Sequence, residues 1–407
     1  MNLQSLVSHP MVRAARSAIH SRDGETIEEQ IRLVSIPAPT GGEGERGKYV
    51  QRRFRELGLE RAHVDEVGNV LGSLGPSRDA SNGHGGPVLL TAHLDTVFPS
   101  GTAIEPRREG GRIMAPGITD NARGLAAILT IAGALRQARI TTRRQLVFVA
   151  TVGEEGLGDL RGVKHLFAAG SPYLTASAFI SLDGAGLTRI VNRAIGASRW
   201  RVTVSGLGGH SWGDRGLANP VHALGLAITK LREIRLDGHA DFSINIGRIG
   251  GGTSVNAIPA RAWLELDLRS EDGDTLNALR VSARAALEAA VRQEIDESTR
   301  GVPLVMDVTT IGDRPCGATP PDDPLVEAAV AATRIVGSVP ELAASSTDAN
   351  VPIALRVPAV AMGAGGRAGG VHTTEEWFEN LGGPLGIERA LLTVLAVAGV
   401  EGIDQGA

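Results

Sequence analysis

This sequence has little cysteine, little lysine and few aromatic residues. Cys316 is the only cysteine, so the chain cannot form an internal disulfide. Of the 41 basic residues only three are lysines, the arginines are scattered, and the net charge is −4, which argues against a nucleic-acid surface. No apolar run is long enough to cross a membrane or to form the core of a secretion signal. We therefore expect a cytoplasmic protein that binds neither nucleic acid nor membrane.

The 407 residues, 42% of them hydrophobic, can bury a large core and favour two domains. Short apolar runs alternate with amphipathic stretches in residues 1–194 and again in 313–407, which is typical of an α/β domain with a mixed, mostly parallel sheet. Between them, residues 195–312 follow the order β-α-β-β-α-β of a ferredoxin-like domain. The sequence thus predicts an α/β domain interrupted by an inserted α+β domain.

Five polar side chains that could bind metal stand at the ends of apolar runs: His93, Asp120, Glu155, Asp183 and His372. Several also have a plain structural explanation. His93 with Asp95 is a common buried pair, and Asp120 stands where a helix N-cap would. Glu154 and Glu155 could form a solvated turn. Taken together, two imidazoles and three carboxylates without cysteine suit two zinc or manganese ions, if one carboxylate bridges them.

Two further acids adjoin this set. Asp95 lies two residues after His93, so both side chains point to the same face of a strand, and Asp95 could hydrogen-bond the imidazole. Glu154 precedes a predicted ligand without being one, which makes it the natural general base for proton transfer from an activated water.

The motifs HLDTVFP, APGITDNARGLAAIL, VGEEGLGD, SLDG, GLGGHS, GGTSVNAIPA and STDANVPIAL follow one another from about residue 80 to residue 380. In this order they resemble the M20 family of co-catalytic metallopeptidases and deacylases. The resemblance implies a site for two zinc or manganese ions that Asp120 bridges. His93 and Asp183 would bind one ion, and Glu155 and His372 the other. Glu154 would be the general base, with Asp95 orienting His93.

The resemblance also implies that residues 195–312 form the lid or dimerisation domain of a homodimer. His210, in the sequence GGHS, would then stabilise the oxyanion, in several members from the partner subunit. Asn256 and Arg269 resemble the Asn and Arg that hold a substrate carboxylate in amidohydrolase members. We expect them on neighbouring strands. Arg269 could instead be an edge-strand arginine in salt bridges.

We accordingly predict a hydrolase that cleaves an amide bond beside a free carboxylate, with two divalent ions as cofactors. Zinc is the first choice, with manganese or cobalt as alternatives. Exopeptidase action on short peptides is the leading hypothesis, and hydrolysis of N-acyl amino acids is the alternative, since the same metals and base would serve both. A metal-binding but inactive scaffold is a third hypothesis, which the presence of Glu154 disfavours.

Overall fold

The computed structural model of the protein describes residues 3–75 and 85–403. The chain divides into two compact units, a core unit (Met1–Ala194 and Ala318–Ala407) and an inserted unit (Ile195–Gly317). The boundary expected at residue 312 falls inside a strand, and the inserted unit ends a few residues later. Within 3–75 and 85–403, no helix is both long and apolar enough to cross a membrane. The cytoplasmic location stays a prediction.

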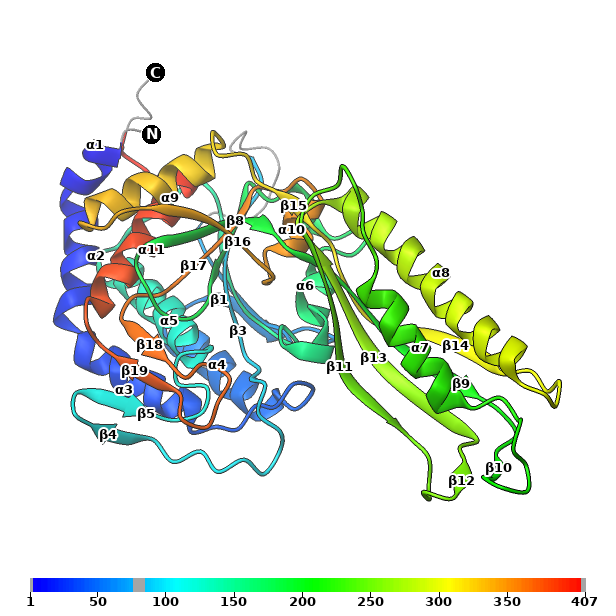
Figure 1. The fold of residues 1–407 in the computed structure, drawn as a ribbon. Coiled ribbons are helices and arrows are strands. Elements are labelled where there is room, and N and C mark those ends of the chain that lie inside the picture. The colour runs from blue at the N-terminus through cyan, green and yellow to red at the C-terminus, as the bar shows by residue number, and fades with distance from the viewer. Residues whose placement is uncertain (1–2, 76–84, 404–407) are drawn as a thin grey trace. The chain divides into compact units, whose positions relative to one another are not determined.

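A nine-stranded sheet forms the centre of the core unit (Figure 1). Its strands are β1 (Glu60–Val64), β2 (Val70–Leu74), β3 (Val88–His93), β6 (Leu146–Thr151), β7 (Ala178–Leu182), β8 (Arg189–Ala194), β15 (Gly317–Ala318), β16 (Glu341–Ser345) and β17 (Ala359–Met362). Their order is β1-β2-β6-β3-β7-β17-β8-β15, and β16 pairs with β8. The central strands β6, β3, β7 and β17 run parallel, whereas β2 and β8 are antiparallel to them. The predicted mixed, mostly parallel sheet is confirmed.

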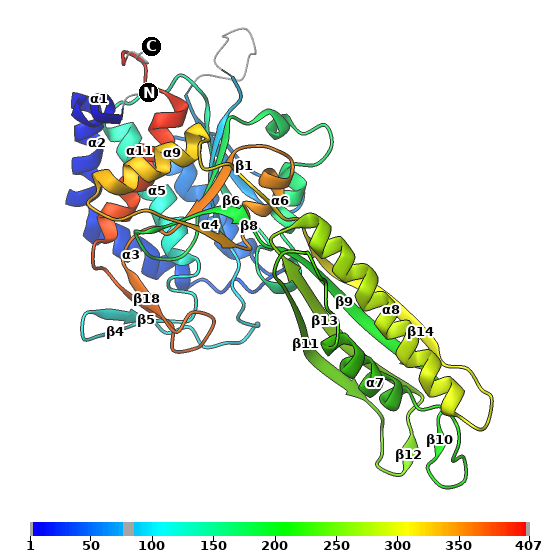
Figure 2. The ribbon, with the colours of Figure 1, turned by 45° about the horizontal axis from the view of Figure 1, so that its top comes forward.

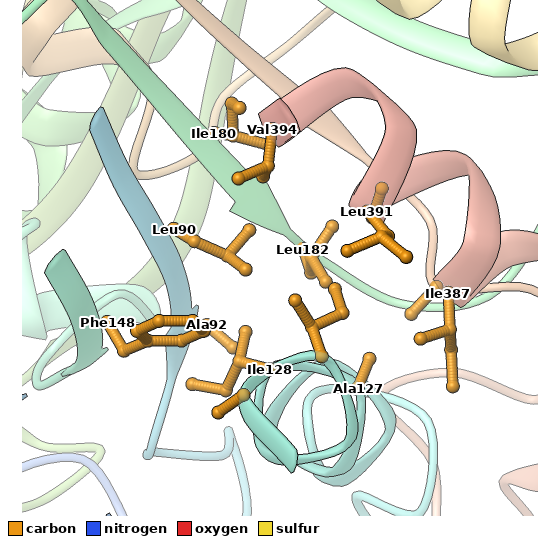
Figure 3. Close-up of a cluster of buried hydrophobic side chains, with 14 of the residues drawn as sticks. Leu90, Ala92, Ala127, Ile128, Phe148, Ile180, Leu182, Ile387, Leu391 and Val394 are labelled. Atoms are coloured by element: carbon orange, nitrogen blue, oxygen red, sulfur yellow. The ribbon is translucent and has the colours of Figure 1, made fainter. Parts of the chain in front are cut away.

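Side chains of the central strands alternate between two hydrophobic layers. Leu90, Phe148 and Ile180 face the larger layer, which is drawn in Figure 3. Their neighbours Leu89 and Phe179 face the smaller layer on the other side of the sheet. Because both faces are covered, these strands are continuous apolar runs in the sequence rather than alternating ones.

Helices supply the covering of both layers (Figures 1 and 2). On the larger layer lie α1 (Leu3–Ser8), α2 (Pro10–Ser21), α3 (Asp23–Val34), α4 (Gly44–Glu56), α5 (Ala122–Gln137), α9 (Pro324–Ile335) and α11 (Gly383–Ala398). On the smaller layer lie α6 (Arg161–Leu166) and α10 (Asn350–Ala354), with the short 3₁₀ turns η2 (Gly156–Gly158) and η3 (Pro172–Thr175) nearby in the chain.

Asn121 determines where the buried helix α5 begins. Its side chain accepts a hydrogen bond from the Gly124 N–H at 3.0 Å, so the N-cap is Asn121 and not the expected Asp120. The same side chain donates to the Leu182 carbonyl at 2.8 Å, at the end of β7. This second bond ties the start of α5 to the end of the sheet, and it leaves the Asp120 side chain available for another role.

A second, smaller sheet of the core unit was not predicted. It contains β4 (Arg107–Glu109), β5 (Arg112–Met114), β18 (Arg367–Gly369) and β19 (Trp377–Glu379), in the antiparallel order β18-β19-β5-β4. Strands of three residues are too short to show an alternating pattern in the sequence. This sheet brings the segment that precedes Asp120 beside the segment that follows His372.

The inserted unit has the predicted ferredoxin-like order. Its elements are β9 (Gly196–Ser205), β10 (Gly209–His210), α7 (Pro220–Arg232), β11 (Phe242–Gly251), β12 (Ala257–Ile258), β13 (Arg261–Ser270), α8 (Gly273–Glu297) and β14 (Val305–Arg314). The main sheet is antiparallel in the order β11-β13-β9-β14, and β10 pairs with β12 in a separate two-stranded ribbon. Both helices lie along one face of the main sheet (Figure 2), where Leu264 and Leu268 are buried. The opposite face carries ion pairs such as Arg201–Glu265.

Candidate active site

Three of the predicted ligands follow from the parallel sheet. His93 is the last residue of β3, Glu155 comes shortly after β6, and Asp183 directly follows β7. These strands are neighbours in the order β6-β3-β7 and run parallel, so their carboxyl ends meet at one edge of the sheet. The topology therefore gathers residues that are up to 90 positions apart in the chain.

Asp120 lies between two histidines and completes two groups of possible ligands. His93 Nε2 is 2.9 Å from Asp120 Oδ1 and 3.7 Å from Asp183 Oδ1. His372 Nε2 is 3.0 Å from the other oxygen, Asp120 Oδ2, and 3.2 Å from Glu155 Oε1. Each group could hold one metal ion, and Asp120 is common to both. The structure thus brings together all five residues that the sequence singled out as ligands.

The polar atoms at the centre of these groups suit metal ligands. His93 Nε2 and Asp120 Oδ1 are buried, and neither has a hydrogen-bond partner with acceptable geometry among the described residues, although they are 2.9 Å apart. A buried polar atom without a partner is costly unless a ligand satisfies it. Two divalent cations would satisfy these atoms and would balance the charge of Asp120, Glu155 and Asp183.

The titration of the two histidines reflects the same surplus of negative charge. Hydrogen bonding to Asp120 and Glu155 raises the pKa of His372 to about 10. Burial by itself would lower the pKa of His93, but the carboxylates of Asp120, Asp183 and Asp95 outweigh burial and raise it well above its ordinary value. Without metal, the carboxylates therefore favour the protonated, positively charged form of both imidazoles.

Two predicted ligands, Asp120 and His372, do not follow a strand of the central sheet, and His372 is the more exposed of the two. It lies in the loop between β18 and β19, its side chain is 53% exposed, and its φ of 66° falls in the left-handed region. A non-glycine residue adopts this conformation only where its surroundings hold it there. The peptide bond between Asp120 and Asn121 is cis.

Asp95 differs from its expected role. The carboxylate is 3.6 Å from His93 Nδ1, and it is the backbone carbonyl of Asp95 that lies 3.0 Å from this nitrogen. The predicted hydrogen bond between the two side chains is therefore not formed. Instead, the buried carboxylate accepts the backbone N–H groups of Glu154 and Glu155, both at 3.0 Å. Asp95 thus fixes the turn that carries the predicted base and a predicted ligand.

Glu154 is buried, and with His93 and Glu155 it forms a third group of residues that could hold a metal ion. Its position on the turn held by Asp95 places a carboxylate next to both groups. This placement agrees with the chemistry expected of a general base, which must lie within reach of the reacting water.

Sequence reasoning missed two buried acids near these residues. Glu376 accepts three backbone N–H groups of the segment that ends at Asp120, and it was hidden in the polar run HTTEEW. Asp348 accepts a hydrogen bond from the Thr151 hydroxyl at the end of β6 at 2.5 Å, and burial raises its pKa to about 6. Glu376 has no sequence signal, because it acts through partners far away in the chain. Asp348 stands in the motif STDANVPIAL, but no role could be assigned to it there, because its partner Thr151 is far away in the chain.

The inserted unit holds the other three predicted residues but does not bring them together. His210 pairs with Ala257 in the ribbon of β10 and β12, and the Ser211 N–H donates to the Asn256 carbonyl, so His210 and Asn256 are neighbours. Arg269 lies at the opposite end of β13, opposite Ala197. The eight residue-to-residue steps from Arg261 to Arg269 span about 26 Å of strand. The expected clamp of Asn256 with Arg269 is therefore not formed within one chain.

His210 and Arg269 each form hydrogen bonds within the inserted unit. His210 Nδ1 accepts the backbone N–H groups of Trp212 and Gly213 at 3.2 and 3.3 Å, which places the proton of a neutral imidazole on Nε2. Arg269 Nε donates to Asp267 at 2.6 Å. This ion pair agrees with the salt bridge of the alternative explanation for Arg269, but β13 lies between β11 and β9, so the expected edge-strand position is wrong.

An α/β core with an inserted α+β unit, and two groups of imidazole and carboxylate ligands that share Asp120, together define a metal-dependent hydrolase. The family model of peptidase family M20/M25/M40 matches residues 89–395, and the chain belongs to this family. The resemblance noted in the sequence is thereby confirmed.

Individual relatives agree with this assignment. The uncharacterized protein YqjE of Bacillus subtilis is 27% identical over 366 residues, which cover 86% of this chain and 92% of YqjE. A succinyl-diaminopimelate desuccinylase of Corynebacterium glutamicum is 29% identical over 265 residues, 62% of this chain and 68% of that protein. The structure of aminopeptidase PepT from Bacillus cereus has a TM-score of 0.71 and 25% identity, and covers 92% of this chain and 98% of PepT.

A further solved structure, the YXEP protein of Bacillus subtilis, is described as a dinuclear metal binding peptidase of family M20. It has a TM-score of 0.65 and 19% identity, and covers 95% of this chain and all of that one. The family thus includes both peptidases and a deacylase, and the reaction common to them is metal-dependent hydrolysis of an amide bond.

The raised pKa of His372 predicts how the stability of the metal-free protein depends on pH. In the unfolded chain this histidine titrates near its ordinary pKa of about 6.5, and in the folded protein at about 10. Its protonated form therefore stabilises the fold below about pH 6.5, and this contribution is lost as the pH rises toward 10. We expect the melting temperature of the metal-free protein to fall between pH 7 and pH 10.

Thermal unfolding after chelation checks this, with metal-free His372→Gln as the control, in which the fall should be smaller. A melting temperature that does not change over this range, or the same change with pH in both proteins, would show that His372 does not have the raised pKa.

Proposed function

We propose that the protein is a two-metal exopeptidase that removes a terminal residue from short peptides with a free carboxylate. The observation that carries the proposal is the position of Asp120, whose two oxygens face His93 and His372 in two separate groups of ligands. The similarity to aminopeptidase PepT over nearly the whole chain favours a peptide as the substrate. Zinc suits the imidazole and carboxylate donors best, with manganese or cobalt as alternatives.

In this proposal the ligands are His93, Asp120 and Asp183 for one ion, and Asp120, Glu155 and His372 for the other. When bound, the ions would supply an activated water and polarise the carbonyl of the substrate. Glu154 would accept a proton from the attacking water and pass it to the leaving amine. Asp95 would keep Glu154 and Glu155 in place through their backbone N–H groups.

Hydrolysis of N-acyl amino acids is the second candidate. It is supported by the similarity to the desuccinylase of Corynebacterium glutamicum, and the same ligands and base would serve it. The two substrates differ in the group beyond the scissile bond, which is a free amine in a peptide and an acyl chain in the other case. A panel of dipeptides, tripeptides and N-acyl amino acids, including N-succinyl compounds, tested with metal-loaded protein, distinguishes the two.

Substitutions separate the proposed ligands from the proposed base. Glu154→Gln should keep the metal content of the wild type while kcat falls by at least about 10²-fold, because only proton transfer is lost. Asp120→Ala should leave well under two ions per chain, and Glu155→Ala should also lose metal. Elemental analysis and steady-state kinetics decide this. Two full equivalents of metal in Asp120→Ala would refute the bridge, and the reverse result for the glutamates would mean that their roles are exchanged.

Arg269 is the proposed partner of the substrate carboxylate. A guanidinium offers two parallel donors to a carboxylate, and a carbonyl misplaced by about 1 Å can lose on the order of 10² in rate. Arg269→Lys should therefore lower kcat/KM at least about tenfold for the best substrate, with the metal content unchanged. Arg201→Lys, on the same face of the sheet and paired with Glu265, is the matched control and should change kcat/KM little.

The substrate provides the second half of this test. A C-terminally amidated form of the best substrate should be poor for the wild type, and Arg269→Lys should reduce its cleavage much less. Equal cleavage of the amide and the free acid by the wild type would mean that Arg269 serves only its ion pair with Asp267.

We further propose a homodimer through the inserted unit, in which His210 and Asn256 act on the site of the partner subunit. Three exposed apolar side chains adjoin these two residues in sequence, namely Leu207 at 69%, Trp212 at 74% and Val255 at 103% exposure. Strand β11 is an edge strand of ten residues, and such an edge is a ready surface for pairing with another chain. The distance from Asn256 to Arg269 also requires that a clamp built from both draws on two chains.

Mixing inactive variants tests this arrangement. His210→Ala mixed with Glu154→Gln should recover part of the wild-type activity, because a hybrid dimer contains one site with an intact base and an intact partner histidine. Glu154→Gln mixed with Glu155→Ala is the control and should recover none, since both core units are then defective. A fully active monomer by light scattering, or no recovery in verified hybrid dimers, would rule out action across the dimer.

A further inference from the structure

Glu376 is a fully buried acid beside the proposed metal site that takes no part in the proposed chemistry. Its Oε1 accepts the backbone N–H groups of Thr119 at 2.8 Å and of Asp120 at 3.0 Å, and its Oε2 accepts that of Gly117 at 2.9 Å. Its backbone carbonyl accepts the Ala115 N–H at 3.0 Å. One residue thus binds the whole segment that leads from β5 to Asp120.

Glu376 also ends the loop that carries His372. Its own N–H donates to the Thr373 carbonyl at 3.2 Å, and Trp377, the next residue, begins strand β19. The loop of His372 and the segment of Asp120 come from opposite ends of the core sequence, and the carboxylate of Glu376 connects them at the margin of the small sheet. The relative position of Asp120 and His372 therefore depends on this side chain.

The other ligands have separate supports. His93 and Asp183 stand at the ends of β3 and β7, and Asn121 ties the far side of Asp120 to the end of β7. Glu155 is held through its N–H by Asp95. Among the five proposed ligands, only His372 lies in the loop that ends at Glu376. Its position relative to Asp120 therefore depends on how Glu376 holds that loop.

We propose that Glu376 is a positioning residue for the second ion, the one assigned to Asp120, Glu155 and His372. It holds the loop of His372 against the segment of Asp120, so its loss weakens this site more than the site of His93 and Asp183. The inference rests on the two-ion site proposed above. Residues that orient metal ligands typically change metal affinity by about 10-fold to 100-fold when they are replaced.

Two substitutions alter the contact in different ways. Glu376→Gln keeps the size but replaces one acceptor by an amide NH₂, which would face a backbone N–H donor. Glu376→Asp keeps the charge but is one methylene shorter, so it cannot reach all three N–H groups. Glu375→Gln is the matched control, because Glu375 is the exposed neighbour and its replacement removes the same charge.

Titration of each metal-free protein with Co²⁺, followed by visible absorption and calorimetry, measures the two binding steps without reference to activity. The wild type and Glu375→Gln should bind two ions. Both Glu376 variants should bind the first ion within about threefold of the wild-type affinity, and the second at least about tenfold more weakly. Thermal unfolding of the metal-free variants shows whether they fold. If only one of them folds, the Co²⁺ titration of that variant decides the test.

The remaining outcomes overturn the inference. Unchanged affinities, or equal weakening of both ions, would show that Glu376 does not position the second site. If neither Glu376 variant folds without metal, the residue serves the fold and not the ligand loop. A wild type that binds fewer than two ions would overturn the two-ion site and this inference with it, whereas a normal wild type with normal variants overturns this inference alone.

Discussion

The repulsion between carboxylates gathered at one edge of the parallel sheet is the constraint on which the rest of this structure depends. Asp120, Glu155 and Asp183 face the two histidines, and Asp95 lies directly behind them. Like charges at such short distances cannot all stay ionised in a buried site unless positive charge or hydrogen-bond donors balance them. The protein meets this need in two ways, which divide the acids into two groups.

Acids of the first group face imidazoles, and they raise the pKa of both imidazoles when no metal is present. Acids of the second group, Asp95 and Glu376, face backbone N–H groups of the turns that present the ligands. Each N–H bond to a carboxylate is stronger than one to a neutral acceptor, so the second group gives the ligand turns a defined position. The acids that do not bind metal thus position those that would.

Features of the fold and the site could be predicted where they depend on residues close together in the sequence, and not where they depend on contacts between distant residues. The parallel strands, the inserted ferredoxin-like unit and the ligand candidates His93, Glu155 and Asp183 follow from local patterns, since apolar runs define strands and a polar residue at a strand end lies at the sheet edge. Asp120 and His372 were also singled out in the sequence, but they lie outside the central strands and only the fold brings them to the same site. The small sheet of β4, β5, β18 and β19 was missed because its strands have three residues each. The cap of α5 was misplaced by one residue, since Asp120 and Asn121 are both good N-caps and only the fold distinguishes them.

The sequence by itself determined the fold class and singled out the residues that we propose as ligands and base, because these depend on residue type and on spacing along one element. Only the tertiary structure decided which groups face each other. It placed Glu376 against the Asp120 N–H across 256 positions of sequence. It also placed Arg269 near the end of β13, whereas Asn256 lies just before β12, beyond the other end of β13, although the two residues are close in the chain. Contacts of this kind depend on strand order and on the direction of each strand, which no local pattern encodes.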